Sequence, residues 1–215
     1  MPWGDGTLIE HVIDTLRPLV DDVIVVVRDA SKFEHLRARV LEDEPLDAHA
    51  LGGLYTGLRA ASHQLCFVCA CDMPFLSQPL IRFLVRQADE CDLVIPRTTQ
   101  GLQPLHAVYT SACLPAIEKQ LSNRRWDLRT LVSKVRAKVI DTSVVHQFDP
   151  DRLSCSNLNT LEEYHTAREI QKNLIRVMEP SSRSRYSFPK GSCGDRTRQM
   201  EPETTLLIRG GGHGI

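Results

Sequence analysis

The stretch "LCFVCACDMPFLS", residues 65–77, determines which fold the sequence predicts. Residues 65–70 are apolar and rich in small or β-branched side chains, a pattern typical of a strand buried on both faces of a parallel sheet. Pro74 cannot extend the strand, because it has no N–H for the ladder. We therefore expect Asp72 at the carboxyl end of this strand, where open α/β sheets bind ligands. A carboxylate that only caps the following turn is the alternative.

Strand-like runs alternate with helical patterns along the chain. The expected strands are residues 22–27, 65–70, "DLVIP" (92–96), "LHAVY" (105–109) and "KVIDT" (138–142). The expected helices are 7–19, 31–39, 77–89, 111–121, 125–134 and one capped by Thr160, and "ALGGLYTGLRAAS" (50–62) reads as a glycine-rich turn that opens another. This alternation predicts an α/β fold with a doubly wound, mostly parallel sheet.

The bulk composition is that of a soluble globular protein. The 215 residues are 42% hydrophobic and 25% charged, with a net charge of −1 and no basic surplus to suggest a nucleic-acid partner. No apolar run approaches the ~20 residues that a membrane span needs. Seven cysteines without a secretion signal indicate a reducing, cytoplasmic compartment. Strand alternation separates Cys66 from Cys69 and Cys71, which favours buried thiols over a zinc site.

The composition changes near Glu179 to Ser, Arg, Gly and Pro. We therefore expect a domain at residues 1–178 and a disordered tail at 179–215, whose removal leaves the melting temperature nearly unchanged. Within the tail, "TLLIRGGGHGI" (205–215) looks like a strand that runs into a glycine loop. No helix follows in the sequence, so we expect no phosphate site there.

Five short motifs occur in a characteristic order. They are "VLED" (40–43), "LGGLYTGL" (51–58), "CDMPF" (71–75), "QPLHAVY" (103–109) and "NLNTLEE" (157–163). With the opening "PWGDGTLIEHVID", the series resembles the molybdenum cofactor guanylyltransferases of the nucleotidyltransferase superfamily. The resemblance implies a Rossmann-like fold and transfer of GMP from GTP to the phosphate of molybdopterin, with or without its metal. It also implies release of pyrophosphate and handover of the product to molybdoenzymes or their chaperones.

The resemblance implies one catalytic carboxylate and two glycines at the nucleotide. Asp72 would hold Mg²⁺, which prefers one or two carboxylates plus phosphate oxygens. Asp43 would contact guanine, whose N1–H and amino group are donors; a solvated charge at a strand end is the alternative. Gly52 and Gly53 would let the backbone approach the base or ribose, or they merely open a helix.

Asn157 or Asn159 would supply an oxygen near the metal or pyrophosphate, as in related nucleotidyltransferases. Asparagine before a helix is also an ordinary cap, and both interpretations stay open. His106 is expected to be structural, because a lone histidine on a strand is usually not catalytic.

Members of that family begin with a strand and a loop of the form L-A-G-G-x-S-x-R-M-G-x-x-K, and this chain starts just after that segment. Gly4 and Gly6 lie in a tight turn and cannot replace the loop. The resemblance therefore predicts an N-terminally incomplete domain that lacks its first strand and phosphate loop, with unpaired neighbouring strands and little or no transfer. A non-catalytic member of the fold and a CTP- or sugar-directed nucleotidyltransferase are the alternatives.

Overall fold

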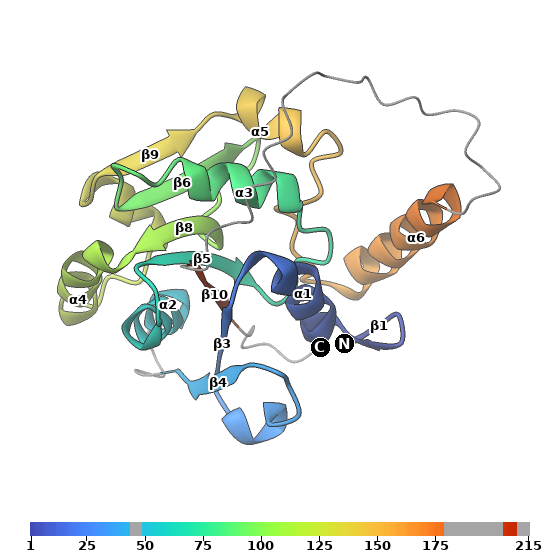
Figure 1. The fold of residues 1–215 in the computed structure, drawn as a ribbon, viewed down its shortest axis with the longest axis horizontal. Coiled ribbons are helices and arrows are strands. Elements are labelled where there is room, and N and C mark those ends of the chain that lie inside the picture. The colour runs from blue at the N-terminus through green and yellow to red at the C-terminus, as the bar shows by residue number, and fades with distance from the viewer. Residues whose placement is uncertain (44–48, 179–203, 210–215) are drawn as a thin grey trace.

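The computed structural model describes residues 1–43, 49–178 and 204–209 of the chain. Eight described strands form one sheet: β3 (Asp22–Val27), β4 (Arg39–Glu42), β5 (Leu65–Ala70), β6 (Leu93–Thr98), β7 (Gly101–Leu102), β8 (His106–Thr110), β9 (Ala137–Ile140) and β10 (Thr204–Arg209). Their order is β4-β3-β10-β5-β8-β6-β7, with β9 paired to β6 (Figure 1). Among these strands β7 and β8 run in one direction and the other six in the opposite direction. The prediction of a mostly parallel α/β sheet is confirmed.

Helices cover both faces of the sheet. The helices are α1 (Leu8–Leu16), α2 (His49–Ala60), α3 (Gln78–Arg86), α4 (Leu114–Ser122), α5 (Thr142–Phe148) and α6 (Leu161–Met178). Helices α1, α3 and α5 share one hydrophobic cluster with the sheet, and α2 and α4 share the cluster on the opposite face. Short 3₁₀ helices η1 (Arg17–Leu19), η2 (Ala30–Phe33), η4 (Ser111–Cys113) and η5 (Leu128–Ser133) and the hairpin β1 (Pro2–Trp3)–β2 (Gly6–Thr7) complete the described elements.

Two helices begin where their sequences predict. Thr7 caps α1 in a capping box: its backbone N–H donates to Oε2 of Glu10 over 2.8 Å, and the backbone N–H of Glu10 donates to Oγ1 of Thr7. Thr160 and Glu163 form the same reciprocal pair at α6, with distances of 2.9 and 3.1 Å. Each box satisfies backbone donors that the first turn of a helix leaves without partners.

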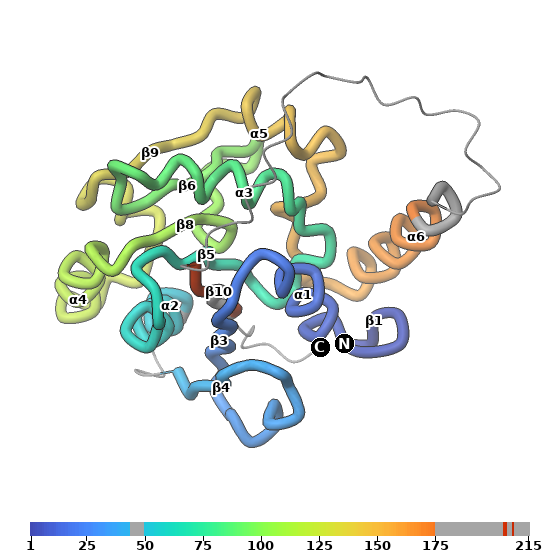
Figure 2. The backbone as a smooth tube through the Cα atoms, in the orientation of Figure 1, coloured from blue at the N-terminus to red at the C-terminus, as the bar shows by residue number. Residues whose placement is uncertain are grey.

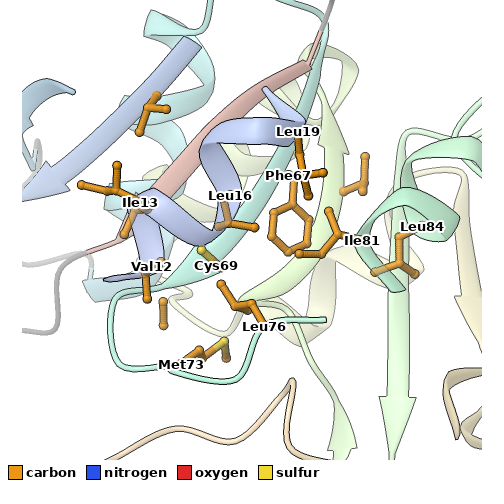
Figure 3. Close-up of a cluster of buried hydrophobic side chains, with 14 of the residues drawn as sticks. Val12, Ile13, Leu16, Leu19, Phe67, Cys69, Met73, Leu76, Ile81 and Leu84 are labelled. Atoms are coloured by element: carbon orange, nitrogen blue, oxygen red, sulfur yellow. The ribbon is translucent and has the colours of Figure 1, made fainter. Parts of the chain in front are cut away.

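The core beneath α1 and α3 explains the apolar run at residues 65–70. Phe67 and Cys69 project from β5 into this cluster, where Leu16 of α1 and Ile81 of α3 meet them (Figure 3). Cys66 and Val68 point into the opposite cluster, under α2 and α4. Because both faces of β5 are buried, every position of the strand is apolar and the sequence shows no alternation of polar and apolar residues.

The prediction of a disordered tail at residues 179–215 is wrong for residues 204–209. They form β10, which lies between β3 and β5 and pairs in parallel with both (Figure 2). Ile208 is fully buried in the cluster under α1 and α3, and the hydroxyl of Thr205 lies 3.4 Å from Oδ2 of Asp22. The central strand position between β3 and β5, which the sequence predicts to be empty, is therefore occupied by an apolar and partly β-branched run. The Ser, Arg and Gly residues around this run made it hard to recognise in the sequence. The rest of the tail, residues 179–203 and 210–215, lies outside the described residues.

Three local predictions also differ from the structure. Gly52 and Gly53 lie inside α2 and not in a turn before it, because the helix begins at His49. The expected helices at 31–39 and 125–134 are the shorter 3₁₀ segments η2 and η5. Helix α5 was not predicted. Among the described residues, no helix has both the length and the apolar character needed to cross a membrane.

Candidate functional site

The turn that follows β5 is fixed from both sides. Met73 is 1% exposed and fills the cluster under α1, beside Leu76 and Cys69 (Figure 3). The carbonyl oxygen of Pro74 lies 2.9 Å from Nε2 of His11 on α1. These contacts anchor the Met-Pro pair in the core, so that half-buried Asp72 stands at the carboxyl edge of the sheet. The structure places Asp72 in the turn two residues after the end of β5, one residue further than the sequence predicted, and its role as a metal ligand stays a prediction.

A second segment reaches Asp72 from a distant part of the chain. The side-chain amide of Asn157 donates to Oδ1 of Asp72 over 3.1 Å, and the backbone N–H of Leu158 donates to the Asp72 carbonyl over 3.0 Å. Asn159 lies apart from this pair, and its backbone N–H donates to Glu163 at the start of α6. Of the two asparagines singled out in the sequence, the structure places Asn157 against Asp72 and Asn159 at the helix cap.

A buried polar network holds the segment that carries Asn157. Ser154 is fully buried, and its Oγ accepts from the backbone N–H of Ser77 over 2.8 Å and lies 3.4 Å from Nε2 of His106. Asp149 accepts from the backbone N–H groups of Leu153 and Ser154. Sequence analysis missed Ser154 and Asp149, because their partners lie more than 40 residues away or in an irregular loop. Polar residues between apolar ones are a sign of such a network, but the sequence does not indicate which polar residue contacts which.

His106 is neutral inside this network. It is fully buried, and burial lowers the pKa of its imidazole from 6.5 to about 3, because the charged form is poorly solvated there. Between pH 6.5 and about pH 3, the unfolded chain therefore binds a proton at His106 that the folded chain does not bind. As pH falls from about 6.5 towards 3, we expect the free energy of unfolding to decrease by up to about 1.4 kcal/mol per pH unit from this group.

Chemical denaturation of the parent chain and of His106→Gln at several pH values between about 7 and 4.5 measures this slope. The substitution should flatten the acid-side decrease, while His165→Gln, at an exposed position on α6, should retain it. Identical slopes for the parent and His106→Gln would contradict a neutral, buried His106.

Asp43 lies at the same edge of the sheet, on the other side of β10. It is 4% exposed, and its backbone N–H donates to the carbonyl of Val27 over 2.8 Å. The strand order β4-β3-β10-β5 puts three strand spacings, roughly 14 Å, between the Asp43 and Asp72 ends of the edge. Two carboxylates so far apart cannot share one metal ion, but they can contact two parts of one elongated ligand.

A cleft of about 450 Å³ opens beside this edge, between α6 and the segment that carries Asn157. Asn157 and Asn159 line it together with Phe75 of the turn after Asp72 and Gln100. Asn157 both lines the cleft and donates to Asp72, so this one side chain connects the cleft with the carboxylate. Gly52 and Gly53 are buried in α2, away from this lining, and their contact with a nucleotide stays a prediction.

A family model described as the MobA-like NTP transferase domain matches residues 1–139, well over half of the chain. The chain belongs to this family. A molybdenum cofactor guanylyltransferase from Desulfosudis oleivorans is 34% identical over 171 residues, which cover 78% of this chain and 84% of the relative. The resemblance that the motifs predicted is confirmed.

Solved structures share the fold of this MobA-like chain. Molybdopterin-guanine dinucleotide biosynthesis protein A from Archaeoglobus fulgidus superposes with a TM-score of 0.70 at 22% identity, over 80% of this chain and 89% of that one. 4-Diphosphocytidyl-2C-methyl-D-erythritol synthase from Anaerococcus prevotii superposes with a TM-score of 0.62 at 15% identity, over 79% and 88% of the two chains. These likenesses confirm the Rossmann-like nucleotidyltransferase fold.

The oxygen atoms of Asp72 are of the kind that Mg²⁺ prefers. Among residues 1–43, 49–178 and 204–209, no three His, Cys, Asp or Glu side chains gather into a metal site. Mg²⁺ does not need such a cage, because it binds through one or two carboxylates and takes the remaining ligands from phosphate and water. The thiols of the C-x-x-C-x-C run do not compete: burial raises the pKa of Cys66 to about 12, and Cys69 lies on the opposite face.

Proposed function

We propose that this chain transfers GMP from GTP to the phosphate of molybdopterin and releases pyrophosphate. The observation that carries the proposal is the Asp72–Asn157 pair at the carboxyl edge of the parallel sheet, next to a cleft large enough for a second substrate. Family membership and the name of the Desulfosudis oleivorans relative support the choice of guanine nucleotide and acceptor. Mg²⁺ is the cofactor that the donor set favours.

The proposed reaction needs no nucleophile from the protein. An oxygen of the molybdopterin phosphate attacks the α-phosphorus of GTP, and the bond from that phosphorus to the bridging oxygen of pyrophosphate breaks in line. Asp72 would hold Mg²⁺, and Asn157 orients the Asp72 carboxylate through the 3.1 Å hydrogen bond. The ion would supply positive charge against the charge that develops on the α-phosphate and on the leaving pyrophosphate. Positioning and electrostatics supply most of the acceleration.

We assign the two substrates to opposite sides of Asp72. The 450 Å³ cleft takes the acceptor, because its lining combines the ring of Phe75 with the amides of Gln100 and Asn159, which suit a planar, hydrogen-bonding pterin. The nucleotide lies across the edge of the sheet towards Asp43, whose carboxylate accepts from the two donors of guanine. The product passes to a molybdoenzyme or its chaperone, and the free thiols favour a reducing cytoplasm.

Transfer from labelled GTP in the presence of Mg²⁺ and molybdopterin tests the proposal. We expect the 215-residue chain to form the guanine dinucleotide, with CTP at least ~10-fold less effective, because the donor pattern of guanine differs from that of cytosine. The sequence predicts little or no transfer partly because a central strand position would be empty, but β10 occupies that position. Preferential transfer from CTP would contradict the guanylyl assignment. Absence of transfer from either nucleotide would favour a non-catalytic member of the fold.

A further inference from the structure

A small cavity of about 60 Å³ lies at the carboxyl end of β6, where Thr98 and residues of α5 line it. Strands β5 and β6 both run antiparallel to β8, so this cavity and the turn that carries Asp72 are at the same edge of the sheet. Gln100 and Ser156 line both the cavity and the 450 Å³ cleft, which makes the two spaces neighbours. The reaction proposed above uses the cleft but not the cavity.

Asp149 is a buried carboxylate in the wall of this cavity. It is 8% exposed, and it accepts from the backbone N–H groups of Leu153 over 3.2 Å and of Ser154 over 3.0 Å. Within the part of the chain that the structure describes, no Lys, Arg or His side chain forms an ion pair with it. Burial raises the pKa of its carboxyl, and the two backbone donors offset only part of that rise. Because a carboxylate has about four acceptor positions, a ligand in the cavity can donate to those that the backbone leaves open.

The charges around the cavity favour a neutral ligand with N–H donors. Asp149 repels an anion, whereas the exposed His146 and Arg152, which also line the cavity, disfavour a cation. Val145 and Cys155 supply buried walls without charge, since burial raises the pKa of the Cys155 thiol to about 12. A water molecule occupies about 10–15 Å³ of such space, so the cavity admits one end of a ring system and not a whole nucleotide.

The loop that carries Asp149 is held in place by its own contacts. Arg152 has a φ of +58°, in the left-handed region, and its backbone N–H donates to the carbonyl of Asp149 over 3.1 Å. A residue with a side chain keeps such a conformation only where its surroundings hold it. Further along the same loop, Ser154 is anchored to Ser77, and Asn157 donates to Asp72. One fixed loop therefore connects the cavity with the candidate metal ligand.

We propose that this cavity binds the aminopyrimidinone end of the acceptor's pterin, with Asp149 accepting from the ring N–H and from the amino group. The rest of the acceptor then lies in the 450 Å³ cleft, beyond Gln100 and Ser156. This inference rests on the proposed function for the identity of the acceptor, but the preference for a neutral pair of N–H donors comes from the cavity itself. Guanine has the same donor pair, so the test has to distinguish the two rings.

Calorimetric titration of the full chain with hydroxymethylpterin and with lumazine, in which an oxygen replaces the amino group, tests the inference. We expect the parent chain to bind hydroxymethylpterin at least ~10-fold more tightly, because lumazine leaves the buried carboxylate without one donor. Asp149→Asn should weaken hydroxymethylpterin by at least ~10-fold and remove the preference, because its amide donates where the carboxylate accepts. Asp151→Asn, at an exposed carboxylate two positions along the chain, is the matched control and should bind like the parent. Equal binding of the two ligands by the parent would contradict the inference.

A second variant does not depend on the buried carboxylate. Thr99 is exposed and lines the cavity, so Thr99→Trp should obstruct the cavity without disturbing the core and weaken hydroxymethylpterin by at least ~10-fold. Melting temperatures of all variants show whether Asp149→Asn is folded; if it is not, Thr99→Trp decides. Guanosine should bind the parent and both variants equally. If the variants weaken guanosine and leave hydroxymethylpterin unchanged, the cavity takes the nucleotide base and the inference is overturned.

The outcomes separate this inference from the proposed function. If the parent chain transfers GMP but the folded variants bind hydroxymethylpterin as the parent does, the inference is overturned while the proposed function stands. If hydroxymethylpterin binding depends on Asp149 and on an open cavity but no transfer from GTP is found, the inference stands and the guanylyl assignment fails. A parent chain that transfers GMP and binds no hydroxymethylpterin overturns the inference alone.

Discussion

Deletion of residues 204–215 is expected to abolish the cooperative unfolding transition of the domain. The deletion removes β10 from between β3 and β5 and leaves one edge of each strand without its ladder. It also removes Ile208 from the core, a loss that by itself costs about 2–5 kcal/mol. Backbone groups left buried without partners add about 1–3 kcal/mol each, so the total reaches the ~5–15 kcal/mol by which a typical domain is stable.

Thermal and chemical unfolding followed by circular dichroism measure this effect. Deletion of residues 210–215 alone keeps β10 and is the control; its transition should match that of the full chain. A point substitution gives a second test: Ile208→Asp places a charge at a fully buried position, whereas Leu174→Asp places one on α6 where the side chain is 43% exposed. An unchanged transition after deletion of 204–215 would contradict a structural role for β10 and would place the whole tail outside the domain.

Replacement of Asp72 by Asn is expected to lower the rate of guanylyl transfer by ~10²-fold or more. The substitution keeps the shape of the side chain and its place beside Asn157, but it removes the negative charge that holds Mg²⁺. Stability should change little, because the backbone hydrogen bond from Leu158 to the carbonyl of residue 72 remains. Initial rates at saturating GTP, together with Mg²⁺-dependent GTP binding, measure the effect.

Asp89→Asn provides the matched control for this experiment. Asp89 is an exposed carboxylate after α3, and its replacement should leave both the rate and the Mg²⁺ dependence of GTP binding unchanged. If Asp72→Asn retains activity within a few-fold of the parent, Asp72 is only a turn residue and the metal is held elsewhere.

The sequence predicted those parts of the fold in which residues close together in the chain determine the structure and the pattern of apolar residues matches their burial. Two capping boxes, at Thr7 and Thr160, mark helix starts because the reciprocal hydrogen bonds need only residues three apart. The apolar run of residues 65–70 identifies a strand because burial on both faces leaves no room for polar side chains. Gly52 and Gly53 made the sequence of α2 resemble a turn, since glycine is commoner in turns. The surrounding leucines nevertheless keep helical spacing, and their burial in the core stabilises the helix.

The parts that could not be predicted depend on long-range pairing. No periodicity connects Asn157 to Asp72, or Ser154 to Ser77, because these contacts arise only after the sheet and its loops have assembled. The strand at residues 204–209 was obscured for a different reason: six residues of strand-like sequence lie within a long segment of polar and glycine-rich composition. The average composition of residues 179–215 is that of a disordered segment, so it does not reveal the strand of six residues within it.

The central place of β10 also determines when the domain can be completed during protein synthesis. β10 follows every other described element in the chain, and Thr205 is separated from its neighbour Asp22 by 183 positions. At ~5–20 residues per second, the ribosome needs on the order of ten seconds after β5 to reach β10. During that interval β3 and β5 have edges that can pair with other nascent chains. The edge that we assign to the nucleotide is therefore the last part of the sheet to form, after translation of the strand that completes it.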